Sequence, residues 1–286
     1  CIGSRGICGA LSEEMLNSKN SKGILLKDEI NRIGGNTNNI DKLSNQFQNV
    51  LACFELHIEQ GTTLENKGID IGVVESMPNI SRHKILIKGQ VGHSGTTLME
   101  NRKDALVVAS KLIIFINKLA KRISQKDNRH FVATVGKIEV SPNYVTIIPS
   151  DVEFIIDLRV VNKTSRDFFL NQLNKEIVKL KKVGNLKINF QDLMNSPYIE
   201  MNKTINESLK KSVNDLNFTF MMMDSGAGHD TAHLAKVSRA SIIFIPCQNG
   251  LSHCPEEFTE SINIKKGSEV ILKSILDLKD NHNEII

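Results

Sequence analysis

The sequence has no tryptophan and only two tyrosines among its 286 residues. Proteins that bind single-stranded nucleic acid stack the bases on aromatic side chains, so this composition argues against that class. The net charge of +4 is small, and the lysines are scattered among acidic residues. Because specific nucleic-acid binding needs a concentrated basic surface, we expect no nucleic-acid partner.

Cysteine is also scarce. The five cysteines are an odd number without regular spacing, which argues against a disulfide framework and favours reduced thiols in a cytoplasmic setting. No apolar run approaches the length of a membrane-spanning helix, and the first residues lack the basic-then-apolar pattern of a signal peptide. We therefore expect a cytoplasmic protein that does not bind a membrane.

The chain does have enough apolar material for a substantial core. With 286 residues, 40% of them hydrophobic, it lies between one large domain and two ordinary ones, and we expect two domains. The first residue is Cys1 and not methionine, which indicates truncation or processing.

Residues 53–59 alternate apolar and polar side chains. A period of two predicts a strand. Phe54 and every second residue after it would face the core, and the polar side chains, with His57 among them, would face the other way.

A series of strand and helix patterns follows Pro78. It predicts a strand, a helix, two strands, a second helix and a last strand, at residues 83–90, 102–123, 131–140, 146–161, 165–182 and 186–192. This βαββαβ order is that of a ferredoxin-like sandwich. In the second helix, Thr164 with Asp167 resembles a capping box.

From about residue 199 the pattern changes to alternating helix and strand. Strands are predicted at 218–223 and 241–245, and the last helix at 264–278. The continuous apolar run at 242–245 suits a strand that is covered on both faces, as in a parallel sheet. The chain is therefore predicted to form an α/β layer, made of residues 1–79 and 198–286, that brackets an inserted α+β module made of residues 80–197.

Three histidines lie at the ends of predicted strands in the outer layer, where ligands of open α/β sheets bind. They are His57, His229 in SGAGHD and His253 in GLSHCPEE. A neutral imidazole is a common zinc ligand. Each segment also has a structural interpretation. His57 could be a half-buried strand histidine, and His253 an ordinary loop residue. The glycine-rich turn before His229 could be a plain connection or, equally well, could cradle an anion.

Two polar residues of the inserted module also allow two interpretations. His93 lies in HSGTT between a strand and a helix, a segment that could be only a turn and an N-cap. Arg159 ends a mostly apolar strand, where its guanidinium needs a partner. It either grips a substrate carboxylate or forms a structural salt bridge, and we expect Asp157 to point away from it.

Six motifs, read together in this order, resemble one family. They are ELHIEQG at 55–61, GHSGTT at 92–97, RKDAL at 102–106, DLR at 157–159, SGAGHD at 225–230 and GLSHCPEE at 250–257. They resemble the amidase/hydantoinase/carbamoylase family, which contains N-carbamoyl-L-amino-acid hydrolases, allantoate amidohydrolases and β-ureidopropionases, within the aminoacylase-like metallopeptidases. The resemblance covers essentially the whole chain.

The resemblance implies an α/β, metallopeptidase-like catalytic domain with two divalent metal ions, zinc or manganese. A ferredoxin-like α+β lid interrupts it and forms the interface of a homodimer. Residues 1–79 and 198–286 would belong to the catalytic domain and residues 80–197 to the lid. By this likeness His57 would bind one metal ion and His253 the other.

The same likeness implies roles in substrate binding. His93 would stabilise the oxyanion and Arg159 would hold the substrate carboxylate. The substrate pocket would be lined by Gln60, Gly228, His229 and, where relatives usually have an asparagine, Thr146. In relatives some lid residues act on the neighbouring subunit's site.

The likeness further implies that the other metal ligands and the general base lie upstream of the segment matching residues 3–5. Since a catalytic zinc normally takes about three protein ligands plus water, we expect the chain by itself to be inactive. For the whole protein we expect cleavage of the linear C–N amide bond of N-carbamoyl amino acids or ureido acids such as allantoate, with release of ammonia and carbon dioxide. The alternatives are an aminoacylase or dipeptidase of the same clan, and a non-catalytic dimerisation or binding remnant.

Overall fold

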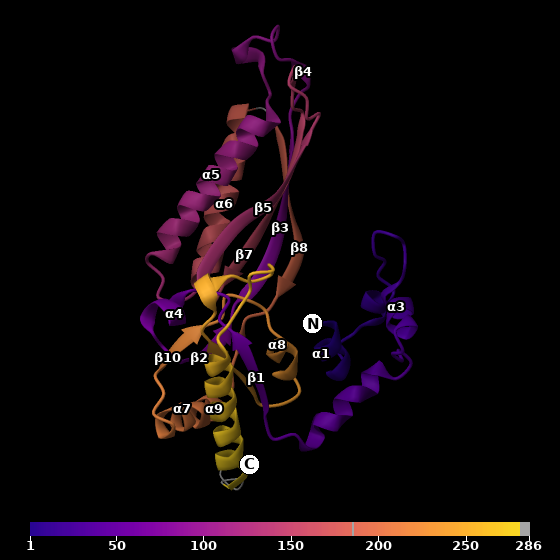
Figure 1. The fold of residues 1–286 in the computed structure, drawn as a ribbon. Helices are drawn as coiled ribbons and strands as arrows, with labels where there is room; N and C mark the ends of the chain where they lie inside the picture. The colour runs from indigo at the N-terminus through magenta and orange to yellow at the C-terminus, as the bar shows by residue number, and fades with distance from the viewer. Residues whose placement is uncertain (185, 281–286) are drawn as a thin grey trace. The chain divides into compact units, whose positions relative to one another are not determined.

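The computed structural model describes residues 1–184 and 186–280 (Figure 1). The chain divides into two compact units. The first comprises residues 1–77 together with the described residues from Ile199 on, and the second comprises Pro78–Tyr198. The boundaries predicted from the sequence, 79/80 and 197/198, lie within two residues of these division points. Among the described residues, no helix is both long enough and apolar enough to span a bilayer.

The first unit is built on a five-stranded mixed sheet. Strand β1 (Cys53–Ile58) pairs in parallel with β11 (Ala240–Ile245). Strand β2 (Ile71–Met77) pairs antiparallel with β11 and in parallel with β10 (Phe220–Asp224). The short β9 (Ile199–Glu200) pairs with the end of β2.

Strand β2 is the main element that the sequence pattern did not predict. It is buried at every position except Glu75, so its sequence shows no alternation between faces. The apolar run in β11 is fully buried, as predicted. The expectation of a parallel sheet was only partly correct, because β2 runs antiparallel to β11.

One face of this sheet is covered by α7 (Lys203–Asp215) and α9 (Ser261–Asp280), whose apolar residues pack with those of β1, β2 and β11. Helix α9 lies very close to β1, because a Cβ atom on Gly267 would lie 2.5 Å from the Leu56 side chain. The short helices α4 (Thr63–Lys67) and α8 (Thr231–Leu234) also contribute to this unit. Residue Leu64 of α4 packs in a second cluster with Phe244.

The N-terminal segment has its own small apolar cluster around Leu11, Leu16 and Ile40. Its helices are α1 (Ile2–Ile7), α2 (Glu13–Leu16), α3 (Leu26–Arg32) and the 3-10 segment η1 (Ile40–Asn49). Helix α1 also contacts α8.

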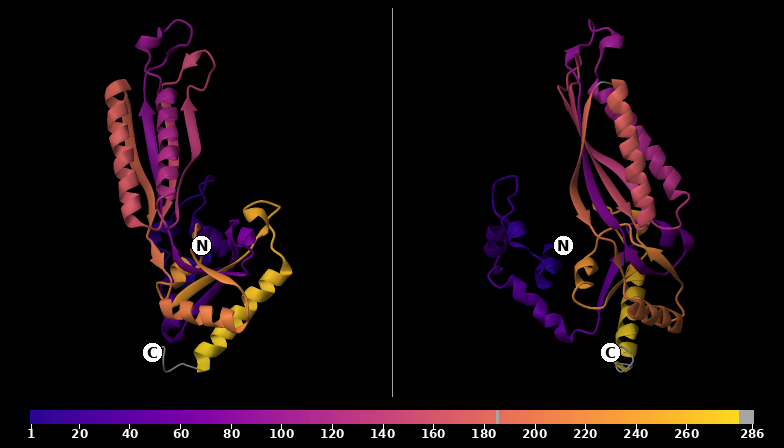
Figure 2. Two further views of the ribbon diagram at one scale, coloured as in Figure 1. Left: turned by 90° about the vertical axis from the view of Figure 1, so that its left-hand side faces the viewer. Right: turned by 180° about the vertical axis from the view of Figure 1, so that it is seen from behind.

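The second unit contains a four-stranded antiparallel sheet. In sheet order its strands are β5 (Phe131–Ser141), β7 (Asp151–Val160), β3 (Asn79–Lys88) and β8 (Lys187–Ser196). Helices α5 (Ala105–Ser124) and α6 (Lys163–Gly184) pack on one face and form a single core with the strands (Figure 2). The predicted ferredoxin-like α+β fold is confirmed.

Two local details of this unit differ from the prediction. The strand expected at 146–161 is split at Pro149 into β6 (Ile147–Ile148) and β7, and β6 pairs with β4 (Gly92–His93). Helix α6 begins at Lys163, and its cap is Asn162, whose side-chain oxygen accepts from the Thr164 backbone N–H at 2.9 Å. Thr164 is therefore inside the helix and is not its N-cap. Short 3-10 turns occur at η2 (Met99–Asn101) and η3 (Gln248–Gly250).

Candidate active site

Strand β1 places Glu55 and His57 on the face of the sheet opposite its apolar side chains, as alternation predicted. Phe54, Leu56 and Ile58 pack into the core formed with α7 and α9. His229, from the connection between β10 and α8, joins the polar pair. One donor atom from each of Glu55, His57 and His229 lies within 4.8 Å of the others, and the two imidazole centroids are 4.5 Å apart.

His57 has its ring fixed by the backbone. Its Nδ1 lies 2.8 Å from the carbonyl oxygen of Ile58. A carbonyl oxygen only accepts hydrogen bonds, so this contact assigns the proton to Nδ1 and leaves the Nε2 lone pair available. Metal-binding histidines usually show this arrangement, with the second nitrogen donating to a carbonyl or carboxylate.

His229 is buried against Phe244, with 5.2 Å between the ring centroids. Its Nε2 lies 2.9 Å from Ser225 Oγ. Burial lowers the pKa of His229 to about 4, and the nearby His57 acts in the same direction. The imidazole is therefore neutral at neutral pH and can accept a hydrogen bond or a cation.

Glu55 is the site residue that the sequence motifs did not single out. Its Oε2 accepts the backbone N–H of Thr231 at 2.7 Å and also the Thr231 hydroxyl. These bonds hold the first turn of α8 against β1, two residues from His229. The available signal was its two-residue spacing from His57, which places both side chains on one strand face.

The end of β1 is also connected to the loop that carries His253. Gln60 Nε2 donates to Ser252 Oγ at 2.7 Å, and this hydroxyl donates to Glu257 Oε2 at 2.7 Å. The same carboxylate oxygen accepts the His253 backbone N–H at 3.0 Å.

The carboxylate of Glu257 is stabilised in its ionised form by hydrogen bonds within the loop. The hydrogen bonds from Ser252 and from the His253 backbone lower the pKa of Glu257, and the charges of His253 and His57 lower it further. Within the described residues, the three-donor group consists of Glu55, His57 and His229 and does not include the exposed His253.

The turn that carries His229 is held by the N-terminal helix. Ser4 Oγ donates to Asp230 Oδ1 at 2.9 Å, and Arg5 Nε donates to His233 Nε2 at 3.2 Å. Gly228, next to His229, is exposed. Residues near the N-terminus thus help to fix the position of this turn.

In the second unit His93 and Thr146 are neighbours. His93 lies in β4 opposite Ile147, and the N–H of Ser94 donates to the Thr146 carbonyl at 2.9 Å. Both side chains are exposed. His93 Nδ1 accepts the Gly95 N–H at 3.0 Å, which assigns its proton to Nε2.

Arg159 lies in the four-stranded sheet, at the end away from His93. It pairs with Ile80 near the start of β3, whereas His93 follows the end of β3 at Lys88. The eight steps from Ile80 to Lys88, at about 3.3 Å each, separate these ends by roughly 26 Å. One copy of this unit therefore does not bring His93 and Arg159 together.

The expectation that Asp157 points away from Arg159 was wrong. Residues two apart in a strand share a face, and Arg159 Nε donates to Asp157 Oδ1 at 2.8 Å. The salt bridge considered from the sequence is present.

The two-unit fold that carries this donor group is that of a peptidase family. The chain belongs to peptidase family M20/M25/M40, whose family model matches residues 12–277. It is 34% identical over 277 residues to an uncharacterized hydrolase of Haemophilus influenzae. It is also 29% identical to an N-carbamoyl-L-amino-acid amidohydrolase of Paenarthrobacter aurescens and 30% identical to the allantoate amidohydrolase of Escherichia coli.

These alignments cover 95–96% of the chain and 65–66% of the relatives. The chain thus spans slightly less than two thirds of the length of the curated relatives it matches.

Comparison with solved structures gives a similar result. An amidase of the hydantoinase/carbamoylase family from Burkholderia multivorans superposes with a TM-score of 0.81 at 28% identity, over 96% of this chain and 66% of that one. The structure of AtUAH in complex with glyoxylate gives a TM-score of 0.81 at 27% identity, over 97% and 67%. The predicted resemblance to this family is confirmed.

Proposed function

We propose that the protein carrying this chain is a metal-dependent amidohydrolase. It cleaves the linear C–N amide bond of N-carbamoyl amino acids or ureido acids such as allantoate, and releases ammonia and carbon dioxide. The observation that carries the proposal is His57 at the end of β1, whose Nδ1 contact leaves its Nε2 for a cation, with the imidazole of His229 beside it for the substrate pocket. The names of the relatives, N-carbamoyl-L-amino-acid amidohydrolase and allantoate amidohydrolase, support the substrate class.

Two divalent metal ions, zinc or manganese, are the proposed cofactors, and the donor chemistry fits them. Imidazole and carboxylate groups ligate both metals, and the Nδ1 contact of His57 leaves its Nε2 for a cation. We assign His57 to one ion and His253 to the other. When bound, such ions polarise the scissile carbonyl and lower the pKa of water.

A catalytic zinc takes about three protein ligands. We therefore propose that further ligands come from parts of the protein outside this chain, and that the chain alone is inactive.

The chain's own residues bind and orient the substrate. His93 Nε2–H would donate to the oxyanion that forms when the carbonyl is attacked. Arg159 would hold the substrate carboxylate, with its charge-assisted hydrogen bonds giving orientation as well as affinity. The remaining pocket residues are proposed to be Gln60, Gly228, His229 and Thr146.

We also propose a homodimer in which each site uses residues from both copies. His93 follows one end of the four-stranded sheet and Arg159 lies at its other end, so a single second unit does not present both to one small substrate. A second copy can supply the missing group. Large apolar side chains are exposed around the His93 end, as expected of a surface that another chain covers: Val91, Leu98, Met99, Tyr144 and Val145.

The test compares substrates on the metal-loaded, full-length enzyme. We expect ammonia release from N-carbamoyl amino acids or allantoate. Release of acetate from N-acetyl amino acids, or of amino acids from dipeptides, would show an aminoacylase or dipeptidase instead. A protein that turns over neither set would be the non-catalytic remnant.

Replacement of His93 tests the oxyanion role. His93→Ala should lower kcat by about 100-fold or more, as the loss of an oxyanion donor does in other hydrolases. Thr96→Ala, in the same exposed turn, is the matched control and should leave kcat unchanged. A His93→Ala enzyme with the wild-type kcat would remove His93 from the chemistry.

A further inference from the structure

Two arginines share the carboxylate of Asp157. Arg159 Nε donates to Oδ1 at 2.8 Å, and Arg82 Nε donates to Oδ2 at 3.2 Å. The register explains this arrangement, because Arg82 lies directly opposite Asp157 in the β3–β7 pair. The sheet therefore holds two guanidinium groups on either side of one acid.

This group lies on the face of the sheet that α5 and α6 leave uncovered. The intervening residues of β7, Ile156 and Leu158, are buried in the core beneath the helices. The side chains of the group are partly exposed, at 50% for Arg82, 25% for Asp157 and 31% for Arg159. A small anion in solvent can therefore reach them.

The group carries one net positive charge. Partial burial raises the pKa of Asp157, but the hydrogen bonds and charges of Arg159 and Arg82 outweigh this and hold its pKa below the usual value. Two cations and one anion remain. Asp157 therefore stays ionised between the two guanidinium groups.

We propose that Asp157 is a positioning residue that orients Arg159 toward the substrate carboxylate, and that Arg82 is the second cationic group of the same anion site. The inference rests on the proposed function, in which Arg159 takes that carboxylate. A guanidinium has five N–H donors in a rigid fork. Engaging the Nε edge with Asp157 fixes the plane of the group before substrate arrives, which reduces the conformational freedom lost on binding.

Kinetics of the metal-loaded, full-length enzyme can separate this role from a structural one. The two substrates are an N-carbamoyl amino acid and its α-carboxamide analogue, which lacks the negative charge. Asp157→Asn should raise KM for the carboxylate substrate by about tenfold, which corresponds to about 1.4 kcal/mol, with little change in kcat. KM for the carboxamide should stay at its wild-type value.

Further variants give the controls. Arg82→Gln should raise KM for the carboxylate substrate in the same selective way. Arg122→Gln makes the same charge change at an exposed position of α5, on the helical side of the unit, and should leave KM unchanged. Asp157→Glu keeps the charge and should restore part of the lost affinity.

Calorimetric binding of the N-carbamoyl acid to the metal-free, full-length protein makes the test independent of turnover. We expect the wild-type protein to bind it about tenfold more tightly than Asp157→Asn. Equal affinity of the two proteins, or a KM that rises equally for both substrates, would overturn the inference. Binding that depends on Asp157 without any hydrolysis would support the inference and contradict only the proposed activity.

Discussion

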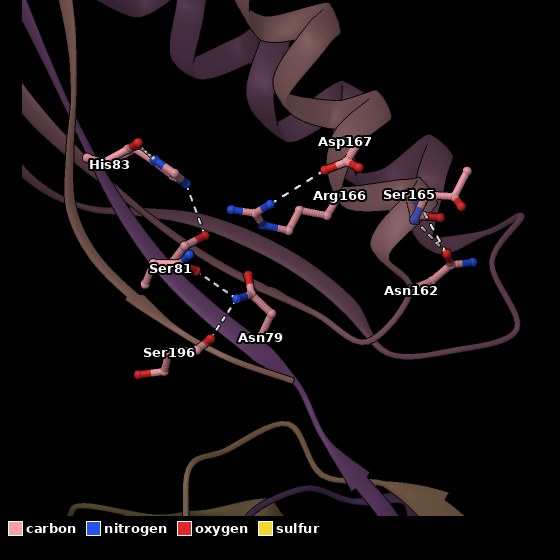
Figure 3. A network of polar contacts seen from close by, with 11 residues as sticks. Asn79, Ser81, His83, Asn162, Ser165, Arg166, Asp167 and Ser196 are labelled. Carbon is pink, nitrogen blue, oxygen red and sulfur yellow. Dashed lines mark hydrogen bonds and ion pairs between the residues drawn. The ribbon is translucent and has the colours of Figure 1, made fainter. Parts of the chain in front are cut away.

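At the scale of single residues, the second unit buries a histidine that the proposed function does not use (Figure 3). His83 Nδ1 lies 2.6 Å from Asp192 Oδ1, and its Nε2 lies 3.0 Å from Ser81 Oγ. The ring stacks on Phe190 with 5.0 Å between centroids. Arg166 of α6 extends from its helix into the same region (Figure 3).

This histidine should make stability depend on pH. Burial lowers the pKa of His83 and the Arg166 charge adds to this, while Asp192 opposes it; the net shift is downward. Because the unfolded-state pKa is about 6.5, the unfolded chain takes up the proton first as the pH falls. The stabilisation is present above about pH 6.5 and is lost as the pH falls through the folded-state pKa.

Urea unfolding at about pH 7.5 and about pH 5.5, on either side of the unfolded-state pKa, measures this effect. The free energy of unfolding should fall on acidification, and His83→Gln should make the fall smaller. His93→Gln, at an exposed position, is the control and should keep the wild-type dependence. If His83→Gln showed the same fall as wild type, the histidine would not be its source.

Residue identities could be predicted from the sequence better than residue partners. The sequence pattern by itself singled out His57, His229 and His253, and the family resemblance added Gln60. A hydrogen bond from Gln60 to Ser252 connects the end of β1 to the loop that carries His253. The grouping of Glu55 with His229 could not be predicted, since it depends on a contact between residues 174 positions apart. The orientation of Asp157 could have been predicted from strand alternation, which was applied incorrectly.

At the scale of elements, periodicity predicted most helices and strands. Strand β2 was not predicted, because it is buried on both faces and its sequence therefore shows no alternation of apolar and polar residues. The break between β6 and β7 follows from Pro149, which has no backbone N–H to pair. The start of α6 was misplaced because Thr164 and Asn162 are both good capping residues, and the capping bond forms only in the folded turn, where Asn162 makes it.

The assignment of Asn162 as the N-cap of α6 predicts that two alanine variants differ in their effect on stability. Asn162→Ala should lower the free energy of unfolding by about 1 kcal/mol, the usual cost of removing an N-cap. Thr164→Ala should have little effect, since the Thr164 side chain is exposed and already inside the helix. Chemical denaturation of the two variants measures this, and a larger loss for Thr164→Ala would show that the cap is misassigned.

At the scale of the whole molecule, each unit has its own apolar core. The second unit begins with β3 and ends with β8, and these strands are paired neighbours, with Ile80 opposite Ser196. Its two connections to the first unit are therefore close together in space. An insertion of this kind therefore disturbs its host little.

This arrangement predicts that residues 78–198 fold without the rest of the chain. Their core joins all four strands to both long helices, so the isolated segment should show one cooperative urea transition followed by circular dichroism. Within this segment, Leu173→Ala should lower the free energy of unfolding by about 2–5 kcal/mol, because Leu173 is fully buried in that core. Val178 is on the same helix but 47% exposed, so Val178→Ala should lower the free energy of unfolding much less. A segment that unfolds without a cooperative transition, or two variants of equal stability, would mean that this core needs the first unit to form.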